Sequence, residues 1–478
     1  MAATLIDRLA EHGESGHVNA YAGFGKTYLI AETVKRLPGC QLILTHTHAG
    51  VDAIRKKLGK LNAPSREYWV DTIAGFALRL CLAYRKHSQW STEFPQGEEW
   101  SKLYTSCVPL LGERFIQRVL QASFTRIFVD EYQDCSLDQH EMTQALSQIM
   151  PTTVLGDPLQ AVFDFGELVD WSKDVEQCFP NLGSLSVPHR WREAGASDLG
   201  DWLIQVRSSI EAGIPIDLRT APKRRVAVYH CDNDEELRNK QISTCKYFRL
   251  PENHTVAAIH GSGHHRKANC QRLAKSTSGV FSSIEEIEGK RLRAFITRLD
   301  VATSASEKLQ CILTFLKEKC MSGVGKAVSA PVMQGKISTI RSNTKNPELA
   351  VAANAYLSNP THSHLGCLLE FVRACPQVRL YARDLFCRLR SVVTLATELD
   401  GTTLMPALDQ FQASLRHRGR PTPSRRVVAT TLLIKGLQYD HTIVLDASTL
   451  GPRDLYVALT RGSRTLTILT ANETVNVP

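Results

Sequence analysis

A short loop that ends in Gly25-Lys26-Thr27 constrains the fold of this chain more than any other feature. A stretch that reads as a buried strand precedes it at residues 18–20, and residues 28–34 read as a helix. Glycine lets backbone amides curl around the phosphates of a nucleotide, Lys26 offsets their charge, and the Thr27 hydroxyl ligates Mg²⁺ beside a helix N-terminus. The predicted phosphate-binding loop consists of Ala22, Gly23, Phe24, Gly25, Lys26 and Thr27.

The loop departs from the usual pattern at one position, because Ala20 stands where that pattern begins with Gly. The alternative interpretation of a Gly-Lys-Thr tripeptide is a solvated turn before a surface helix. The strand before the loop and the helix after it favour nucleotide binding over that turn.

A pair of acidic residues, Asp130-Glu131, follows the apolar run at residues 127–129. At the C-terminal end of such a strand Asp130 is placed to hold Mg²⁺, and Glu131 is placed to activate the attacking water. An acidic turn that caps the next helix from Asp134 or Ser136 would explain one carboxylate, but not a pair at the end of an apolar strand. The second segment therefore predicts that the bound nucleotide is hydrolysed.

Composition points to a folded protein of several domains. The chain has 478 residues, of which 43% are hydrophobic, enough for the cores of two to four domains. No run of roughly 18 apolar residues occurs, and Asp7 lies early in the chain, so neither a membrane span nor a signal peptide is expected. The 13 cysteines lack metal-ligand spacing and are expected to be reduced packing residues of a cytoplasmic protein.

The net charge of +9 favours a polyanionic partner, and nucleic acid is the leading candidate. Much of the excess lies in two clusters, one at residues 223–225 and another in a stretch that contains Arg416, Arg418, Arg420, Arg425 and Arg426. The alternative for each cluster is a solvated linker whose charges only keep the protein soluble.

Strand-like and helical segments alternate between residues 18 and about 190, which predicts a parallel sheet covered by helices on both faces. A second α/β unit opens near residue 226 and resumes only at residue 427. The residues between have helical periodicity, so we expect a helical insertion at about 281–420 and a smaller one at about 80–122. The predicted fold class is α/β, with two parallel sheets flanked by helices and interrupted by helical insertions.

Eight motifs follow one another in a fixed order: the phosphate loop and residues 45–50, 71–77, 130–134, 156–163, 189–191, 435–440 and 455–461. This series resembles motifs I, Ia, Ib, II, III, IV, V and VI of superfamily 1 helicases of the UvrD/Rep/PcrA type, over residues 18–190 and 427–466. The resemblance implies two RecA-like P-loop NTPase domains. Residues 1–190 would form domain 1A, residues 191–280 and 421–478 domain 2A, and residues 281–420 a reduced 2B-like insertion.

The resemblance also implies roles for individual residues in ATP hydrolysis with Mg²⁺. Gln160 would sense the γ-phosphate, Arg190 would reach it, and Arg461 would act as the arginine finger. Gly436 and Gln438 would contact the nucleotide, with Gln438 at the place where a Glu commonly meets the ribose. No Gln precedes the phosphate loop, so the adenine-reading motif of the family cannot be carried over.

On the nucleic-acid side, the resemblance implies contacts from His46 in motif Ia and Thr72 in motif Ib, where the usual His is replaced by Ala74. Phe163 and Phe165 are the candidates for stacking on bases. For both phenylalanines the alternative is ordinary packing in the core.

The predicted function is an ATP-dependent DNA helicase or translocase on single-stranded DNA or DNA with single-stranded ends, moving 3′ to 5′ in DNA repair or antiphage defence. The compact size resembles the UvrD-like subunit of the Gabija antiphage system, which implies an OLD-type nuclease as a partner. The alternative is a nucleic-acid-sensing ATPase switch that regulates a partner nuclease without processive unwinding. A metabolic P-loop kinase is disfavoured, because Gln160, Arg190 and Arg461 would have no role there.

Overall fold

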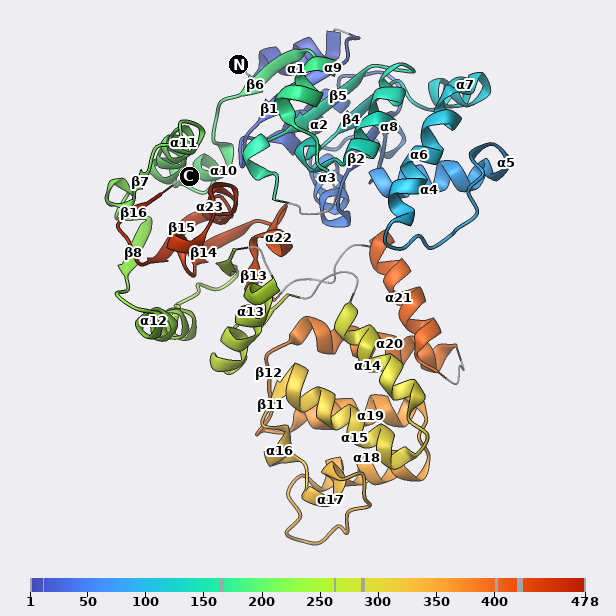
Figure 1. Ribbon diagram of the computed structural model, residues 1–478, viewed down its shortest axis with the longest axis vertical. Coiled ribbons are helices and arrows are strands. Elements are labelled where there is room, and N and C mark those ends of the chain that lie inside the picture. The colour runs from blue at the N-terminus through green and yellow to red at the C-terminus, as the bar shows by residue number, and fades with distance from the viewer. Residues whose placement is uncertain are drawn as a thin grey trace.

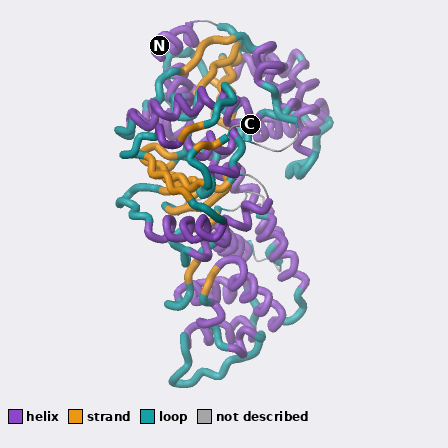
Figure 2. Tube along the Cα trace, turned by 60° about the vertical axis from the view of Figure 1, so that its left-hand side comes forward, coloured by secondary structure: helices purple, strands orange, loops and turns teal. Residues whose placement is uncertain are grey.

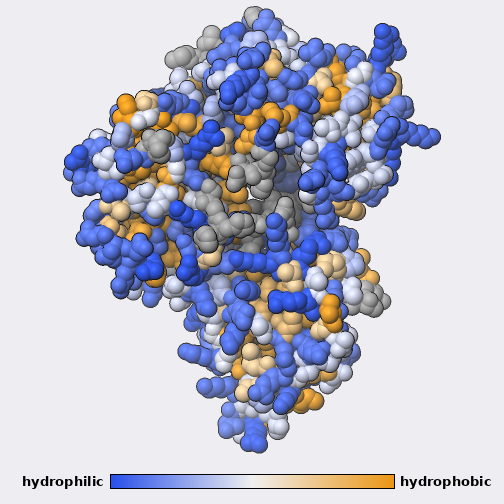
Figure 3. Space-filling view, in the orientation of Figure 1, coloured by the Kyte–Doolittle hydropathy of each residue, from blue (hydrophilic) through white to orange (hydrophobic). Residues whose placement is uncertain are grey.

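The computed structural model describes residues 2–11, 13–162, 167–261, 264–284, 289–399, 403–418 and 424–476. Two α/β units lie in the upper part of the molecule and a mostly helical lobe lies below them (Figure 1). The view in Figure 2 shows two separate groups of strands in the upper part, both surrounded by helices. Hydrophilic residues cover most of the face seen in Figure 3, as expected for a surface in water.

The first sheet is parallel throughout and has six strands in the order β3-β2-β4-β5-β1-β6. Its strands are β1 (Gly16–Ala20), β2 (Gln41–Thr45), β3 (Tyr68–Thr72), β4 (Arg126–Val129), β5 (Thr152–Gly156) and β6 (Asn181–Leu185). The helices of this part are α1 (Ala2–Glu11), α2 (Lys26–Val34), α3 (His48–Lys60), α4 (Ile73–Ala83), α5 (Arg85–Ser88), α6 (Glu99–Gly112), α7 (Arg114–Ser123), α8 (Leu137–Ser147) and α9 (Glu176–Cys178).

Both faces of the first sheet are buried, because successive side chains of a strand point to opposite faces and each face has its own core. Ile43 and Phe128 pack in one core with residues of α1, α2 and α3. Leu42 and Val129 pack in another with residues of α4, α6 and α8. With both faces covered, the carboxyl ends of the strands are the places left for a ligand.

The second sheet is also parallel and has six strands in the order β10-β13-β9-β14-β15-β8. These strands are β8 (Val226–His230), β9 (Val256–His260), β10 (Ser282–Ser283), β13 (Arg426–Thr430), β14 (Tyr439–Val444) and β15 (Gly462–Thr470). Around it lie α10 (His189–Glu193), α11 (Ser197–Glu211), α12 (Asp234–Tyr247), α13 (His264–Ser276), α22 (Thr431–Ile434) and α23 (Pro452–Leu459), with a small antiparallel pair of β7 (Ile216–Asp217) and β16 (Thr474–Val475).

The helical lobe interrupts the second sheet, because the chain leaves after β10 and returns in the neighbouring strand β13. Its helices are α14 (Lys290–Val301), α15 (Ala305–Phe315), α16 (Val324–Ala327), α17 (Ala330–Met333), α18 (Pro347–Ser358), α19 (His362–Ala374), α20 (Arg383–Glu398) and α21 (Met405–Arg418). They share a core with one face of the second sheet, and a short antiparallel pair joins β11 (Met321–Ser322) to β12 (Arg379–Leu380).

The predicted α/β fold class, with two RecA-like units and helical insertions, is confirmed by these two parallel sheets. Residues of both sheets, together with α11 and α23, belong to a single apolar core that also includes α2 and α3. That shared core holds the second sheet against the carboxyl end of the first. Within the described ranges, no helix combines the length and the apolar character that a bilayer crossing requires.

Candidate functional site

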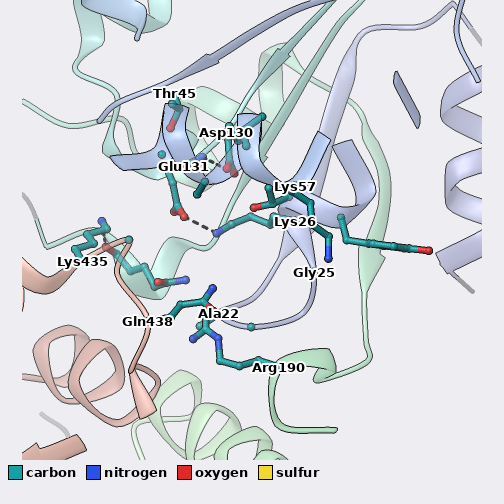
Figure 4. Close-up of a pocket in the computed structure, with 18 of the residues that line it drawn as sticks. Ala22, Gly25, Lys26, Thr45, Lys57, Asp130, Glu131, Arg190, Lys435 and Gln438 are labelled. Atoms are coloured by element: carbon teal, nitrogen blue, oxygen red, sulfur yellow. Dashed lines mark hydrogen bonds and ion pairs between the residues drawn. The ribbon is translucent and has the colours of Figure 1, made fainter. Parts of the chain in front are cut away.

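A cavity of about 520 Å³ lies between the carboxyl ends of the first sheet and the facing part of the second unit (Figure 4). Residues from both units line it, so the cavity depends on the packing of one unit against the other. The predicted site residues that line it are Ala22, Gly23, Gly25, Lys26, Thr27, His46, Asp130, Glu131, Gln160, Arg190, Gly436, Gln438 and Arg461.

Two of the predicted residues that the structure describes, Phe24 and Thr72, do not line this cavity. Phe24 is buried against Tyr21, with ring centroids 5.4 Å apart, and so supports the loop from behind. Thr72 is buried as the N-cap of α4, where its Oγ1 accepts a hydrogen bond of 2.9 Å from the Gly75 amide. Phe163 and Phe165 lie outside the described residues.

The phosphate loop has the backbone geometry that its glycines were expected to provide. Gly23 and Gly25 have φ values of 75° and 94°, in the left-handed region that favours glycine. A Cβ on Gly23 would also lie 2.8 Å from the ring of Trp191, whose indole N–H donates to the Gly462 carbonyl at 2.9 Å. The loop therefore packs directly on a residue that is anchored to the second unit.

The two carboxylates after β4 lie in different electrostatic environments. Lys26 Nζ is 3.1 Å from Glu131 Oε2, and Gln133 Nε2 donates to the same oxygen at 2.7 Å. Burial raises the pKa of Glu131, but the charges of Lys26 and Lys435 outweigh it and lower the pKa to about 2. Burial and the charge of Glu131 raise the pKa of Asp130 to about 7. A nearby cation would stabilise the ionised form of such a buried carboxyl.

The carboxylate of Asp157, at the end of β5, joins the phosphate loop to the second unit. It is fully buried, and its Oδ2 accepts hydrogen bonds from the Ala22 amide at 2.9 Å and Gln160 Nε2 at 2.8 Å. Its Oδ1 accepts a hydrogen bond of 2.6 Å from Arg207 on α11. Arg207 also donates to the Tyr456 hydroxyl of α23 at 3.0 Å.

Gln160 and the two predicted arginines form the second connection between the units. Arg461 Nη2 donates to Gln160 Oε1 at 2.6 Å, and Arg190 Nη1 donates to the Thr460 carbonyl at 2.5 Å. Burial lowers the pKa of both arginines, and the neighbouring charge of Arg461 contributes to the decrease at Arg190, to about 9. The half-buried Arg190 and the buried Arg461 both line the cavity, and their guanidinium groups form a cationic wall that suits an anion with several charges.

Lys435 crosses from the second unit to the first. Its Nζ pairs with Asp134 Oδ1 and donates to the Gln160 carbonyl. Burial lowers the pKa of Lys435, although Asp134 and Glu131 oppose that change. Burial also raises the pKa of Asp134 to about 7, despite the charge of Lys435. This buried ion pair is a third contact that closes the cavity.

His46 lies at the cavity wall, and its Nε2 is 3.4 Å from Cys135 Sγ. Burial and the charge of Lys435 lower the pKa of His46 to about 4, so the imidazole is neutral at physiological pH. This position is beside the phosphate loop, and contact of His46 with nucleic acid stays a prediction.

Two arginines of the basic stretch near residue 420 have backbone partners. Arg425 donates to the carbonyls of Pro251 and His254, and Arg426 donates to the Phe248 carbonyl at 2.9 Å. They tie β13 to the segment before β9. The side chains of Arg416, Arg418 and Arg420 lie outside the described part of the structure.

Several lining residues were missed by sequence reasoning. Tyr28 and His189 flank Gly25, where a Cβ would lie 3.8 Å from Tyr28 Cβ and 3.4 Å from the His189 ring. Lys57 on α3 lies 5.1 Å from the centre of the Tyr28 ring. The position of Tyr28 directly after Lys26-Thr27 was a usable signal, but nothing in the sequence pointed to Arg207.

The residues that line the cavity fit a nucleoside triphosphate with its metal ion. Left-handed glycines and a buried lysine form the phosphate loop, Arg190 and Arg461 line the same cavity, and the buried Asp130 lies near Lys26. Figure 4 shows Lys26, Asp130 and Arg190 around the cavity. The two arginines would bind a polyanion, and the Asp130 carboxyl, whose pKa is raised, would bind a divalent cation. A polyanion together with its divalent cation would therefore pair with both parts of the site.

Comparison with known proteins identifies one family segment. Residues 98–167 match the family described as UvrD/REP helicase N-terminal domain. This match supports the predicted relationship to superfamily 1 helicases over the segment that contains Asp130, Glu131 and Gln160. No curated protein matches the chain.

The solved structures that are similar to the chain include two helicases of low sequence identity. The Pif1 helicase from Candida albicans shares 11% identity over 99% of this chain and 94% of its own, with a TM-score of 0.41. The arterivirus nonstructural protein 10 (helicase), solved with DNA, shares 16% identity over 55% of this chain and 50% of its own, with a TM-score of 0.27. At these identities and TM-scores, neither structure identifies a function for this chain.

The Asp157–Arg207 pair generates a stability prediction. Arg207→Ala leaves the fully buried Asp157 without its cation, so we expect a loss of about 3 kcal/mol or more in the free energy of unfolding, measured by urea denaturation. Arg219→Ala is the matched control, because Arg219 is exposed and pairs only at the surface with Asp217 and Glu473. An unfolding midpoint equal to that of the control would refute the structural importance of the pair.

Proposed function

We propose that the chain is a nucleic-acid-dependent ATPase that works as a DNA helicase or translocase. The observation that carries this proposal is the hydrogen bond between Gln160 and Arg461, because it joins the phosphate side of the first unit to the second unit across the cavity. A site built from two units senses the nucleotide through their relative position. The segment match to the UvrD/REP family supports the same conclusion.

In this proposal Lys26 and the loop amides hold the β- and γ-phosphates of ATP, while Thr27 and Asp130 hold Mg²⁺. The metal ion, when bound, would neutralise charge on the phosphates. Tyr28 and His189 line the cavity beside Gly25, where their rings can contact the base. Gln438 lies in the wall, where its amide can form a hydrogen bond with the ribose. These contacts replace the adenine-reading Gln that the sequence lacks.

Glu131 is the proposed general base. Its ion pair with Lys26 holds it as a carboxylate, and phosphate oxygens would compete for the lysine when ATP binds. Loss of that partner raises the basicity of Glu131 at the point where it must accept a proton from water. Arg190 and Arg461 then stabilise the charge that develops on the γ-phosphate.

Movement would come from the closing and opening of the two units around the nucleotide. We propose residues 1–190 as domain 1A, residues 191–280 and 421–478 as domain 2A, and residues 281–420 as a reduced 2B-like insertion. Single-stranded DNA would lie across both units, with His46, Thr72, Phe163 and Phe165 as contacts. The direction would be 3′ to 5′, as the resemblance of the motif series to UvrD/Rep/PcrA-type helicases implies. The nuclease partner and a role in antiphage defence or DNA repair belong to the same proposal.

The two central ATPase roles can be separated by mutation. Lys26→Ala should weaken ATP binding and abolish turnover, because the phosphates lose their main positive charge. Glu131→Gln should keep ATP bound but reduce turnover by 10²-fold or more, about the contribution of a general base. Nucleotide binding by fluorescence titration and phosphate release would be measured on both, and near-parental turnover in Glu131→Gln would exclude the base assignment.

The proposed function is tested by ATP turnover with and without single-stranded DNA, beside strand displacement on duplexes with a 3′ or a 5′ single-stranded tail. We expect stimulation by the strand and displacement from the 3′ tail, both lost in Glu131→Gln. Stimulation without displacement from either tail would exclude a helicase and leave a translocase or the sensing switch. ATP turnover that is the same with and without DNA would contradict both the proposed function and the sensing switch.

A further inference from the structure

The strand at the free edge of the second sheet has no protection against pairing. The sheet ends at β10 on one side, with two residues, and at β8 on the other, with five. Strand β8 lies at the left margin of the molecule in Figure 1. Within the described ranges, no strand pairs with its outer side.

The outer edge of β8 presents backbone groups that are ready for a partner strand. The Arg225 carbonyl accepts from the Leu466 amide at 2.8 Å, and the Cys231 amide donates to the Thr470 carbonyl at 3.0 Å, so the odd-numbered residues face β15. Because backbone groups alternate along a strand, Val228 and His230 direct their N–H and C=O groups outwards. Hydrogen bonds to these groups are what β-pairing supplies.

Features that normally block such an edge are missing from β8. Its sequence from Val226 to His230 contains no proline, lysine or acidic residue, and its pairing with β15 has no bulge. Four of its five residues are exposed, including Val228 at 36% and Tyr229 at 39%. The edge is therefore both accessible and partly apolar.

Opposite charges flank the two ends of this strand. Lys223 and Arg224 precede it, and Asp232, Asp234 and Glu235 follow it; all five are exposed. The Asp232 side chain is 80% exposed, and its carboxylate lies 3.2 Å from His230 Nε2. A parallel copy of the same strand would bring like charges together, whereas an antiparallel copy brings the basic end against the acidic end.

We propose that β8 pairs in antiparallel orientation with β8 of a second copy of this chain, which forms a two-fold symmetric dimer. The outward groups define the register: Val228 lies opposite Val228 of the second copy, and Val226 lies opposite His230. The Val226 amide already donates to the Pro222 carbonyl at 2.9 Å. Across the interface Val226 therefore uses its carbonyl, which accepts a hydrogen bond from the His230 amide of the second copy. In this register Arg224 lies opposite Asp232.

The dimer is weak and depends on concentration and salt. A single pair of five-residue strands buries less surface than a standard stable interface, which implies an affinity in about the micromolar range or weaker. Exposed ion pairs at both ends are screened as salt rises. Because β8 does not line the ATP cavity, dimer formation is independent of the proposed hydrolysis.

Sedimentation velocity of the full chain, at low salt and protein concentrations up to about 100 µM, tests the proposal. The parent should shift from monomer to dimer with concentration. Arg224→Glu and Asp232→Arg should each remain monomeric, because each places like charges opposite one another. A mixture of the two variants should dimerise again, since the charges then complement each other at both ends of the strand pair.

Val228→Pro provides a second variant, because it removes an outward N–H on an edge strand without breaking the pairing to β15. This substitution should abolish the dimer. ATP turnover equal to that of the parent would show that the variant is folded. A monomeric parent at every concentration would overturn the proposal. A dimer that survives both charge variants, or a mixture that stays monomeric while each variant turns over ATP normally, would also overturn it.

Discussion

The rest of the site depends on the hydrogen bonds and the ion pair of the fully buried Asp157 carboxylate. It binds the Ala22 amide of the phosphate loop, the side chain of Gln160 and the guanidinium of Arg207. A buried carboxylate that loses its partners costs several kcal/mol, so these three groups must stay in place while the protein is folded. The loop, the proposed γ-phosphate sensor and α11 are therefore fixed with respect to one another.

Two routes lead from this carboxylate to the second unit. One passes through Arg207 to the Tyr456 hydroxyl on α23, and the other passes through Gln160 to Arg461. Both are hydrogen bonds of side chains that are buried, where water does not compete. A change at the γ-phosphate position can thus reach the second unit through contacts rather than through a flexible linker, which is what a nucleotide-driven cleft requires.

The sequence revealed those parts of the site whose chemistry lies within one contiguous segment. The phosphate loop and the Asp130-Glu131 pair could be recognised because strand, turn and functional group follow one another directly. The contact between Lys435 and Asp134 joins residues 301 positions apart, and no local pattern marks either residue as a partner of the other. Arg207 lies in a helix whose sequence is ordinary. Fold class was predictable from alternating segments, but strand order in the second sheet was not, because it depends on how non-contiguous pieces pack.

The most direct test of the account is a double-mutant cycle on Gln160 and Arg461, with DNA-stimulated ATP turnover as the measurement. Arg464→Ala is the control, because Arg464 is a half-buried arginine of β15 that pairs with Asp440 outside the cavity. If the two residues act as one connection, Arg461→Ala lowers turnover by about 10³-fold and the double variant is no slower than the worse single variant. Effects that multiply in the double variant would mean that the residues act independently, and would contradict the proposed coupling of the two units through the nucleotide.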